Sequence, residues 1–215
     1  HGSCSEHQLN MTLKIYGIAA SRAIRPLWVA EELSLPYEHI KLHFNAAELK
    51  QEPYVSMNPN GLVPIIDDNG LILYESLAIT LHLAKRYGNG TLFPANESAQ
   101  ALALQWTLWA ATEAEPPARQ WFQHTQFLPT EKRQPMLAEM GLAKAREKVM
   151  ILDQHLKDKP YLLGDAFTIA DLNVAAVLQR LPAIAQDLAP HALDWHQRCF
   201  GRPAALRAIA LRDKQ

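Results

Sequence analysis

The segment that most constrains the fold is residues 58–76, which read NPNGLVPIIDDNGLILYES. Because proline cannot donate a hydrogen bond to a sheet ladder, Pro64 is expected at the first residue of a strand, where a cis peptide bond after Val63 is plausible. The turn sequence DDNG at residues 67–70 predicts a tight hairpin to a second, antiparallel strand. The backbone beside Pro64 is then left unpaired and can bind an extended peptide.

The hairpin leads into a pair of polar residues, Glu75 and Ser76, that open a helix. From Leu77 onward the apolar residues follow the helical period, which predicts an amphipathic helix. Its free amides and positive dipole end attract a carboxylate to which Ser76 can donate, while Glu75 offers a negative charge to an ammonium group. A carboxylate and an ammonium group together describe an α-amino acid. The alternative is an ordinary capped helix after a hairpin.

Composition limits the classes of partner. A chain of 215 residues that is 48% hydrophobic can bury a sizeable core in one large or two small domains. A net charge of −1 without a basic block argues against nucleic acid and anionic membranes as partners. No apolar run approaches the ~18 residues of a membrane span. Cys4 and Cys199 form neither a disulfide framework nor a zinc knuckle, which fits a reducing, cytoplasmic location.

The first part of the chain reads as strand, loop, helix and strand. Residues 12–16 alternate as a short strand, and residues 22–35 carry apolar side chains at helical spacing, with Ser21 expected as the N-cap. A second strand at residues 37–42 and a helical turn at residues 45–51 follow. The resulting order βαβαββα is that of a thioredoxin-like domain, in which a right-handed crossover makes the first two strands parallel.

The second part of the chain is predicted to be helical. Residues 88–96 (GNGTLFPAN) read as an interdomain linker. Helical periodicity then persists with almost no strand signal, over residues 97–125, 131–157, 168–181 and 203–212. We therefore expect a thioredoxin-like domain over residues 11–87 and an all-α domain over residues 97–215. Residues 1–10 are interpreted as a tag remnant or disordered leader, because Met11 reads as a natural start.

A further motif lies in the helical part. Residues 164–171 (GDAFTIAD) predict a capping box between Thr168 and Asp171 beside a hydrophobic staple, so Asp171 is expected to serve folding rather than catalysis. Together with the Val-Pro step and the Glu-Ser pair, this motif resembles the glutathione transferase family. The matches cover nearly the whole chain in the family's order and spacing.

The resemblance implies an α/β thioredoxin-like N-terminal domain joined to an all-α C-terminal domain, in a cytoplasmic homodimer. The implied activity is conjugation of the glutathione thiolate to a small hydrophobic electrophile, a detoxification reaction with glutathione as co-substrate and no metal. The alternative is a binding or regulatory protein that keeps this fold without transferase turnover. The joint presence of Ser21, Glu75 and Ser76 favours the enzyme.

The resemblance also implies roles for individual residues in holding glutathione. Val63, the residue before the cis-proline Pro64, pairs through its main chain with the cysteinyl part, and Glu75 with Ser76 holds the γ-glutamyl end. Lys50 lies at a distance along the chain from which it can pair with the glycine carboxylate, as a lysine does in some members. The alternative for Lys50 is a solvated surface lysine.

Ser21 is the candidate for activating the thiol. It ends the loop after the first strand and precedes a helix, so its hydroxyl and the helix amides can be aimed at one point. Serine-type family members carry the active serine in this loop, four residues before an arginine, and Ser21 with Arg25 matches. Tyr16 is the rival, since other classes use a tyrosine near the end of the first strand. A plain N-cap role for Ser21 is the third possibility.

The electrophile is expected between the domains, against the helix that contains QWTLWAATEAEPP. Trp109, Glu113 and Pro116 share one face of that helix by their spacing and are the candidate pocket residues. Trp106 is expected in the core instead.

Overall fold

The computed structural model describes residues 12–214. The predicted leader at residues 1–10 lies outside the described residues. The first domain contains the elements β1 (Leu13–Tyr16), α1 (Ile24–Glu32), β2 (Glu38–Ile40), η1 (Ala47–Lys50), α2 (Tyr54–Met57), β3 (Ile65–Asp68), β4 (Leu71–Tyr74) and α3 (Ser76–Tyr87).

These strands form one four-stranded mixed sheet in the order β2-β1-β3-β4. β1 pairs with β2 in parallel, with Ile15 opposite His39, and with β3 in antiparallel fashion, with Ile15 opposite Ile66. The hairpin then adds β4 at the edge, with Ile66 opposite Leu73. The expected thioredoxin-like topology is therefore confirmed, because the helical crossover through α1 gives the parallel pair and the tight turn gives the antiparallel one.

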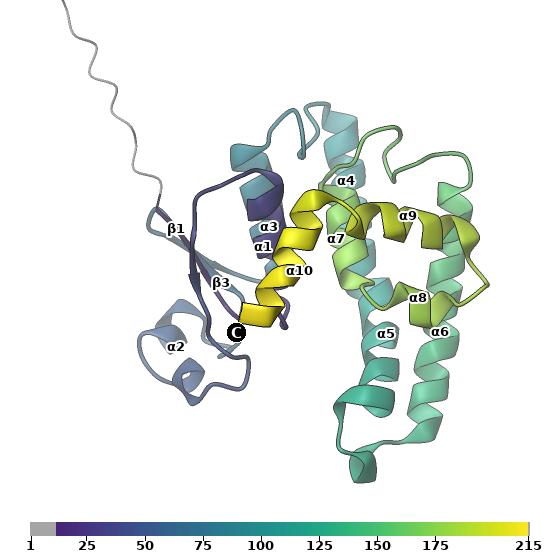
Figure 1. Ribbon diagram of the computed structural model, residues 1–215, viewed down its shortest axis with the longest axis horizontal. Helices are drawn as coiled ribbons and strands as arrows, with labels where there is room; N and C mark the ends of the chain where they lie inside the picture. Colours follow the sequence, from purple (N-terminus) through teal and green to yellow (C-terminus); the bar gives the residue numbers. More distant parts are fainter. Residues whose placement is uncertain (1–11, 215) are drawn as a thin grey trace, which may run out of the picture.

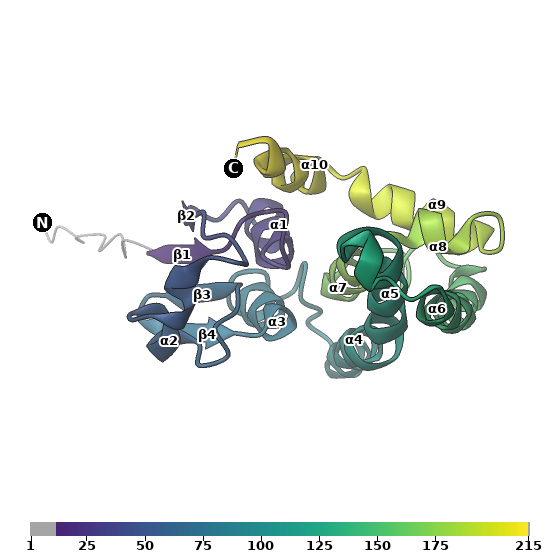
Figure 2. The same ribbon diagram turned by 90° about the horizontal axis from the view of Figure 1, so that it is seen from below.

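The two faces of the sheet are covered differently. α1 and α3 lie together on the face that looks toward the second domain (Figure 2). Ile15 and Ile66 are fully buried beneath them, together with Trp28 of α1. Since strand side chains alternate, Tyr16 points to the other face, where its ring meets Tyr54 of α2 edge-on at 5.9 Å between centroids.

The second domain is helical, as expected from its periodicity, and Figure 1 shows its helices beside the sheet domain. Its elements are α4 (Glu97–Trp109), the π-helical η2 (Ala110–Ala114), α5 (Glu115–Phe122), the π-helical η3 (Gln123–Phe127), η4 (Thr130–Lys132), α6 (Pro135–Leu156), α7 (Ile169–Val177), α8 (Leu181–Ala185), α9 (Pro190–Phe200), α10 (Pro203–Ala210) and η5 (Leu211–Lys214). Among residues 12–214 no helix combines the length and the hydropathy needed to span a bilayer.

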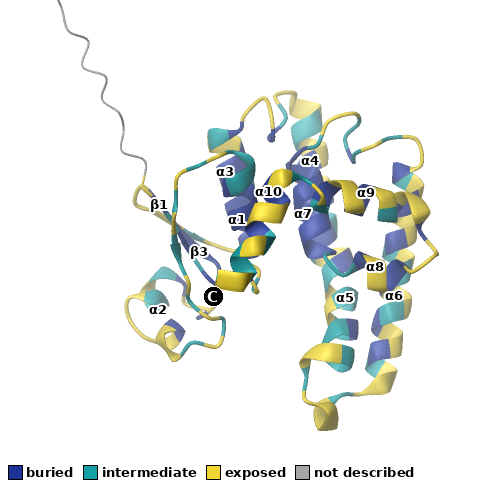
Figure 3. Ribbon diagram, in the orientation of Figure 1, coloured by how far each residue is buried: buried dark blue, intermediate teal, exposed yellow. Residues whose placement is uncertain are grey.

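α7 occupies the centre of the molecule, and its residues are buried throughout (Figure 3). The expected capping box is present at its start, where the carboxylate of Asp171 accepts the amide of Thr168 at 2.9 Å. The same carboxylate accepts the amide of Leu162 and the indole N–H of Trp195, each at 2.8 Å. Asp171 therefore fixes a loop and α9 as well as its own helix.

A buried polar contact joins the two domains at α7. Asn173 accepts a hydrogen bond from Thr80 of α3 at 2.7 Å and donates one to Thr107 of α4 at 3.0 Å. All three side chains are almost completely buried. A satisfied buried network of this kind allows one relative placement of α3 and α4, because any shift would leave polar groups without partners.

Candidate functional site

Ser21 lies in the turn between β1 and α1. α1 begins only at Ile24, so Ser21 is not its N-cap as the sequence had predicted; Ala23 holds that position. The Ser21 hydroxyl donates a hydrogen bond to the carbonyl of Ile18 at 2.7 Å and accepts one from the backbone N–H of Ala23 at 3.1 Å. The side chain is half-buried at the rim of a cleft and stabilises the turn itself.

Val63 lies across from this turn. A Cβ atom added to Gly17 would stand 2.7 Å from Cβ of Ala23 and 3.1 Å from Cβ of Val63, so only glycine allows this approach. The Val63–Pro64 peptide bond is cis. Within residues 12–214, neither the amide nor the carbonyl of Val63 takes part in a hydrogen bond. Its main chain is therefore available to a ligand at the position that the sequence indicated.

Glu75 and Ser76 differ in their surroundings. Glu75 is exposed and has φ 71 and ψ 106, a conformation that a glutamate rarely adopts. Ser76 begins α3, is only 6% exposed, and accepts a hydrogen bond from Nη1 of Arg25 at 3.0 Å. A hydroxyl that accepts one bond still has its proton to donate, so Ser76 remains competent to bind a carboxylate.

Arg25 links this helix start to the second domain. Its Nη2 donates to Oε2 of Glu115 in α5 at 3.1 Å, and Arg22 pairs with the other oxygen of Glu115. Burial lowers the pKa of the Arg25 guanidinium, and the charge of Glu115 opposes that change. Sequence reasoning did not find Glu115, because only the folded chain places a residue of the helical domain beside α1.

Lys50 ends η1 and is exposed. Its Nζ lies 3.4 Å from the carbonyl oxygens of Asn60 and of Gly61, contacts longer than a typical hydrogen bond. Gly61, with φ +63, leaves the room for this ammonium group, since an added Cβ would stand 2.5 Å from Nζ. Lys50 is thus held loosely near the chain that leads to Val63.

Tyr16 does not line the cleft beside Ser21. Its ring lies on the opposite face of the sheet against Tyr54. Burial, followed by the negative charge of Asp67, raises the pKa of the Tyr16 hydroxyl.

The cleft beside Ser21 has a volume of about 450 Å³ and lies between the two domains. It is lined by Ala20, Ser21, Arg22, Arg25, Phe44, Asn45, Leu62, Val63, Glu115, Ala118, Arg119, Phe122, Gln123, Phe127, Val177, Leu178, Gln179, Arg180 and Ile184. Apolar and aromatic side chains thus line the cleft together with four arginines and one glutamate, and small-molecule sites commonly combine an apolar lining with a few polar groups.

The structure does not place the three predicted pocket residues, Trp109, Glu113 and Pro116, in this cleft. Glu113 instead pairs with Lys148 of α6 at 2.7 Å, and Trp109 packs edge-on against Trp106 at 5.1 Å. The spacing argument assumed a regular α-helix, whereas residues 110–114 are π-helical. After this π-helical segment, Glu115, Ala118 and Phe122 line the cleft together with Ser21.

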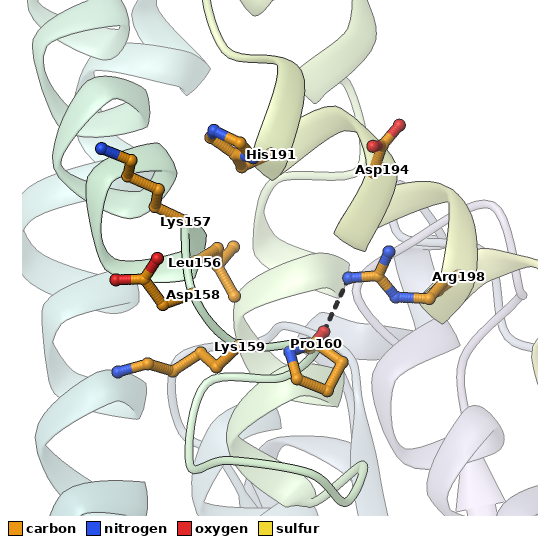
Figure 4. A pocket seen from close by; sticks show the side chains of 8 residues that line it. All are labelled: Leu156, Lys157, Asp158, Lys159, Pro160, His191, Asp194 and Arg198. Carbon is orange, nitrogen blue, oxygen red and sulfur yellow. Dashed lines mark hydrogen bonds between the residues drawn. The ribbon is translucent and has the colours of Figure 1, made fainter.

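A second hollow of about 390 Å³ lies between the end of α6 and α9 (Figure 4). Lys157, Asp158 and Lys159 extend from its α6 side, and Arg198 on the other side donates to the carbonyl of Pro160 at 2.8 Å. Asp194 adds a second carboxylate. Charges of both signs are mixed there without a buried polar group aimed into the hollow, so we assign it no function.

Comparison with known proteins gives consistent matches over both domains. The family model "Glutathione S-transferase, N-terminal domain" matches residues 11–85, and "Glutathione S-transferase, C-terminal domain" matches residues 100–203. A glutathione S-transferase of Hyoscyamus muticus is 30% identical over 93% of this chain and 98% of its own length. Glutathione S-transferase GstB of Escherichia coli K12 is 29% identical over 86% of this chain and 91% of its own.

Among solved structures, the theta class glutathione S-transferase of Xanthomonas axonopodis pv. citri, crystallised with glutathione bound, superposes with a TM-score of 0.83 at 28% identity. The superposition covers 92% of this chain and 96% of that one.

Proposed function

Because this chain belongs to the glutathione S-transferase family, we propose that it conjugates the thiolate of glutathione to a small hydrophobic electrophile held in the cleft beside Ser21. The observation that carries the proposal is that Ser21 and the unpaired main chain of Val63 border the same cleft. Arg25, which also lines it, binds Ser76 at the start of α3. In this proposal the ligand extends from the cleft past Arg25 to Ser76, which is not itself among the residues that line the cleft.

In this proposal glutathione lies across the edge of the N-terminal domain. Its γ-glutamyl carboxylate accepts from Ser76 and the free amides of α3, and its ammonium group meets Glu75. Its cysteinyl part pairs with the main chain of Val63 before Pro64. Lys50 binds the glycine carboxylate, for which its loose contacts with carbonyl oxygens leave it free.

Ser21 then stabilises the thiolate. A thiol with a pKa near 8.5 is roughly 3% ionised at pH 7, and lowering that pKa by about two units needs ~2.7 kcal/mol. A hydrogen bond from the Ser21 hydroxyl can supply much of this. To donate it, the hydroxyl must turn away from the Ile18 carbonyl that it now contacts at 2.7 Å. The sulfur attacks the electrophile, and the leaving group departs with its electron pair.

A cytoplasmic homodimer active in detoxification completes the proposal. β4 is an edge strand that exposes Leu71, Ile72 and Tyr74, and α4 exposes Leu104 and Leu108. Apolar side chains gathered on a sheet edge and a helix are suited to burial against a second copy.

Two measurements test the function. Retention on immobilised glutathione with elution by free glutathione tests binding, and conjugation of glutathione to 1-chloro-2,4-dinitrobenzene tests turnover. We expect the protein both to bind glutathione and to catalyse the conjugation. Binding without turnover of a panel of electrophiles would favour the regulatory alternative, and the absence of both binding and turnover would contradict the proposal.

A further inference from the structure

Arg180 lies in the cleft, where no acidic side chain among the described residues pairs with its charge. It follows α7, and its guanidinium carbon stands 3.5 Å from the centroid of the Phe122 ring. Within residues 12–214, this guanidinium makes neither an ion pair nor a hydrogen bond. Burial, followed by the positive charge of Arg212, lowers the pKa of Arg180. A half-buried cation beside another cation is costly unless an anion is supplied.

The residues that the structure describes do not supply that anion. Arg212 itself donates to two neutral acceptors, the carbonyl of Ala19 at 3.3 Å and the amide oxygen of Gln179 at 2.9 Å. Four arginines and one glutamate line the cleft, which gives the lining a net charge of +3. The glutamate, Glu115, is already shared by Arg22 and Arg25. Arg119 and Arg180 therefore have no counter-charge among the described residues.

Arg212 contacts both the turn that contains Ser21 and the segment that contains Arg180. Ala19 is in the same turn as Ser21, and Gln179 is the neighbour of Arg180 in the chain. Arg212 thus ties the segment that carries Arg180 to the turn that carries Ser21. A small molecule can contact both ends within one cleft of about 450 Å³.

The aromatic and aliphatic side chains of the cleft determine which uncharged part of such a molecule can bind. Phe44 and Phe127 lie with ring centroids 6.4 Å apart, and Phe122 lies 5.9 Å from Phe127. Leu62 adds an aliphatic surface that is otherwise exposed. This wall suits a flat aromatic or apolar body, and Arg180 stands over Phe122 at its end.

We propose that the electrophile of this enzyme is an organic anion, a flat apolar body with a carboxylate that binds the guanidinium of Arg180. This inference rests on the proposed transferase function. Arginine presents its donors in a planar fork that matches a carboxylate, and the apolar wall around it strengthens the contact. A neutral electrophile of the same shape would leave the cation unpaired.

The test compares two aryl chlorides, anionic 4-chloro-3,5-dinitrobenzoate and neutral 1-chloro-2,4-dinitrobenzene. In both, the thiolate sulfur bonds to the ring carbon that carries chlorine, and chloride leaves with the electron pair of the broken bond. The thiol proton goes to solvent when the thiolate forms. Arg180→Gln should lower kcat/KM for the benzoate by roughly 10- to 100-fold, and for the neutral compound by less than about three-fold.

Two further variants serve as controls. Arg180→Lys keeps the charge without the fork and should give an intermediate loss for the benzoate. Lys85→Gln removes one positive charge from an exposed position on α3 and should leave the ratio of the two rates unchanged. Equal losses for both electrophiles in Arg180→Gln would overturn the proposal, and so would a rise confined to the KM for glutathione.

Binding can be measured without turnover. Titration calorimetry with the unreactive 3,5-dinitrobenzoate should show an affinity that falls about ten-fold or more in Arg180→Gln. If the wild type conjugates neither aryl chloride but binds this anion through Arg180, the transferase function fails and the anion site stands. If it conjugates the neutral compound and does not bind the anion, the anion site fails alone.

Discussion

The guanidinium of Arg25 in α1 donates a hydrogen bond at 3.0 Å to the hydroxyl of Ser76, the first residue of α3. Its other terminal nitrogen binds Glu115 of α5 at 3.1 Å. Because Arg25 is 6% exposed, these hydrogen bonds form away from water, and their strength depends on the exact positions of donor and acceptor. Arg25 thus connects α1, the start of α3 and α5 of the helical domain through one side chain.

We expect Arg25→Lys to lower the free energy of unfolding by about 2–4 kcal/mol, because an ammonium group cannot reach both acceptors in the same plane. Arg22→Lys is the matched control. The Arg22 side chain is 44% exposed and pairs with the same Glu115, so its loss should stay below about 1 kcal/mol. Urea unfolding at pH 7 measures both, and equal losses would contradict a special role for the buried contact.

Glu75 combines an unfavourable backbone conformation with a proposed binding role. Glu75→Gly should raise the free energy of unfolding by about 0.5–1 kcal/mol, since glycine adopts φ 71 without strain. The same change should weaken glutathione binding about ten-fold, because it removes the carboxylate that faces the ammonium group.

Glu75→Gln separates the two effects. It should weaken glutathione binding to a similar extent without the gain in stability. Thermal melts and titration calorimetry together check both variants. Unchanged affinity in both would remove the γ-glutamyl site from the start of α3.

Asp171→Ala should destabilise the fold by about 3–5 kcal/mol, more than the ~1 kcal/mol that the capping box alone predicts. Three buried donors, the amides of Leu162 and Thr168 and the indole N–H of Trp195, would lose their acceptor. Glutathione affinity per folded molecule should not change. Normal stability with lost activity would assign Asp171 a role in the reaction instead.

The architecture could be predicted where its signals are local. The turn between β3 and β4 has Asn69 at φ 53 and Gly70 at φ 93, the positive values that the DDNG sequence implies. α9 was not predicted, although Ala192, Trp195, His196 and Cys199 are buried at helical spacing. The helix was missed because polar residues separate these buried positions, although the positions do follow an amphipathic pattern.

The candidate site was less accessible to sequence reasoning, because most of its charged groups come from distant elements. Glu115 and Arg180 lie 90 and 155 residues after Arg25 in the chain, and no local motif marks either. The prediction that Trp109, Glu113 and Pro116 share one face assumed regular α-helical spacing, but residues 110–114 are π-helical. The turn with Ser21, in contrast, could be predicted because it lies between a strand and a helix that are both visible in the local sequence.

Acid should weaken the fold through His196. Burial lowers the pKa of its imidazole to about 4, and its Nε2 donates to the carbonyl of Leu178 at 2.9 Å. The unfolded chain has the ordinary value near 6.5 and so binds the proton first between these two pH values. Stability is therefore full above about pH 6.5 and falls as the pH drops toward 4, by about 2–3 kcal/mol near pH 4.5.

His196→Asn removes this titration. Its unfolding free energy should be lower than that of the wild type at pH 7 and should change less between pH 7 and pH 4.5. Urea unfolding at several pH values measures the difference. An identical pH dependence in both proteins would show that another group causes the acid sensitivity.

Ser21 decides between chemistry and mere binding. Ser21→Ala should lower kcat/KM at least ten-fold while glutathione affinity changes little, because the hydroxyl acts on the thiolate rather than on the bound thiol. It should also cost about 1 kcal/mol of stability, since the amide of Ala23 loses its acceptor within the turn. Tyr16→Phe should affect the rate much less, because Tyr16 packs on the other face of the sheet.

The pKa of the enzyme-bound thiol separates the two residues directly. Followed by thiolate absorbance against pH, it should rise toward about 8.5 in Ser21→Ala, because the anion has lost a donor. A smaller rise in this pKa would indicate that the amides at the start of α1 provide the remaining stabilisation of the thiolate. If the titration stays fixed in Ser21→Ala and moves in Tyr16→Phe, the tyrosine activates the thiol despite its position. If neither variant moves it, the chain binds glutathione without activating it.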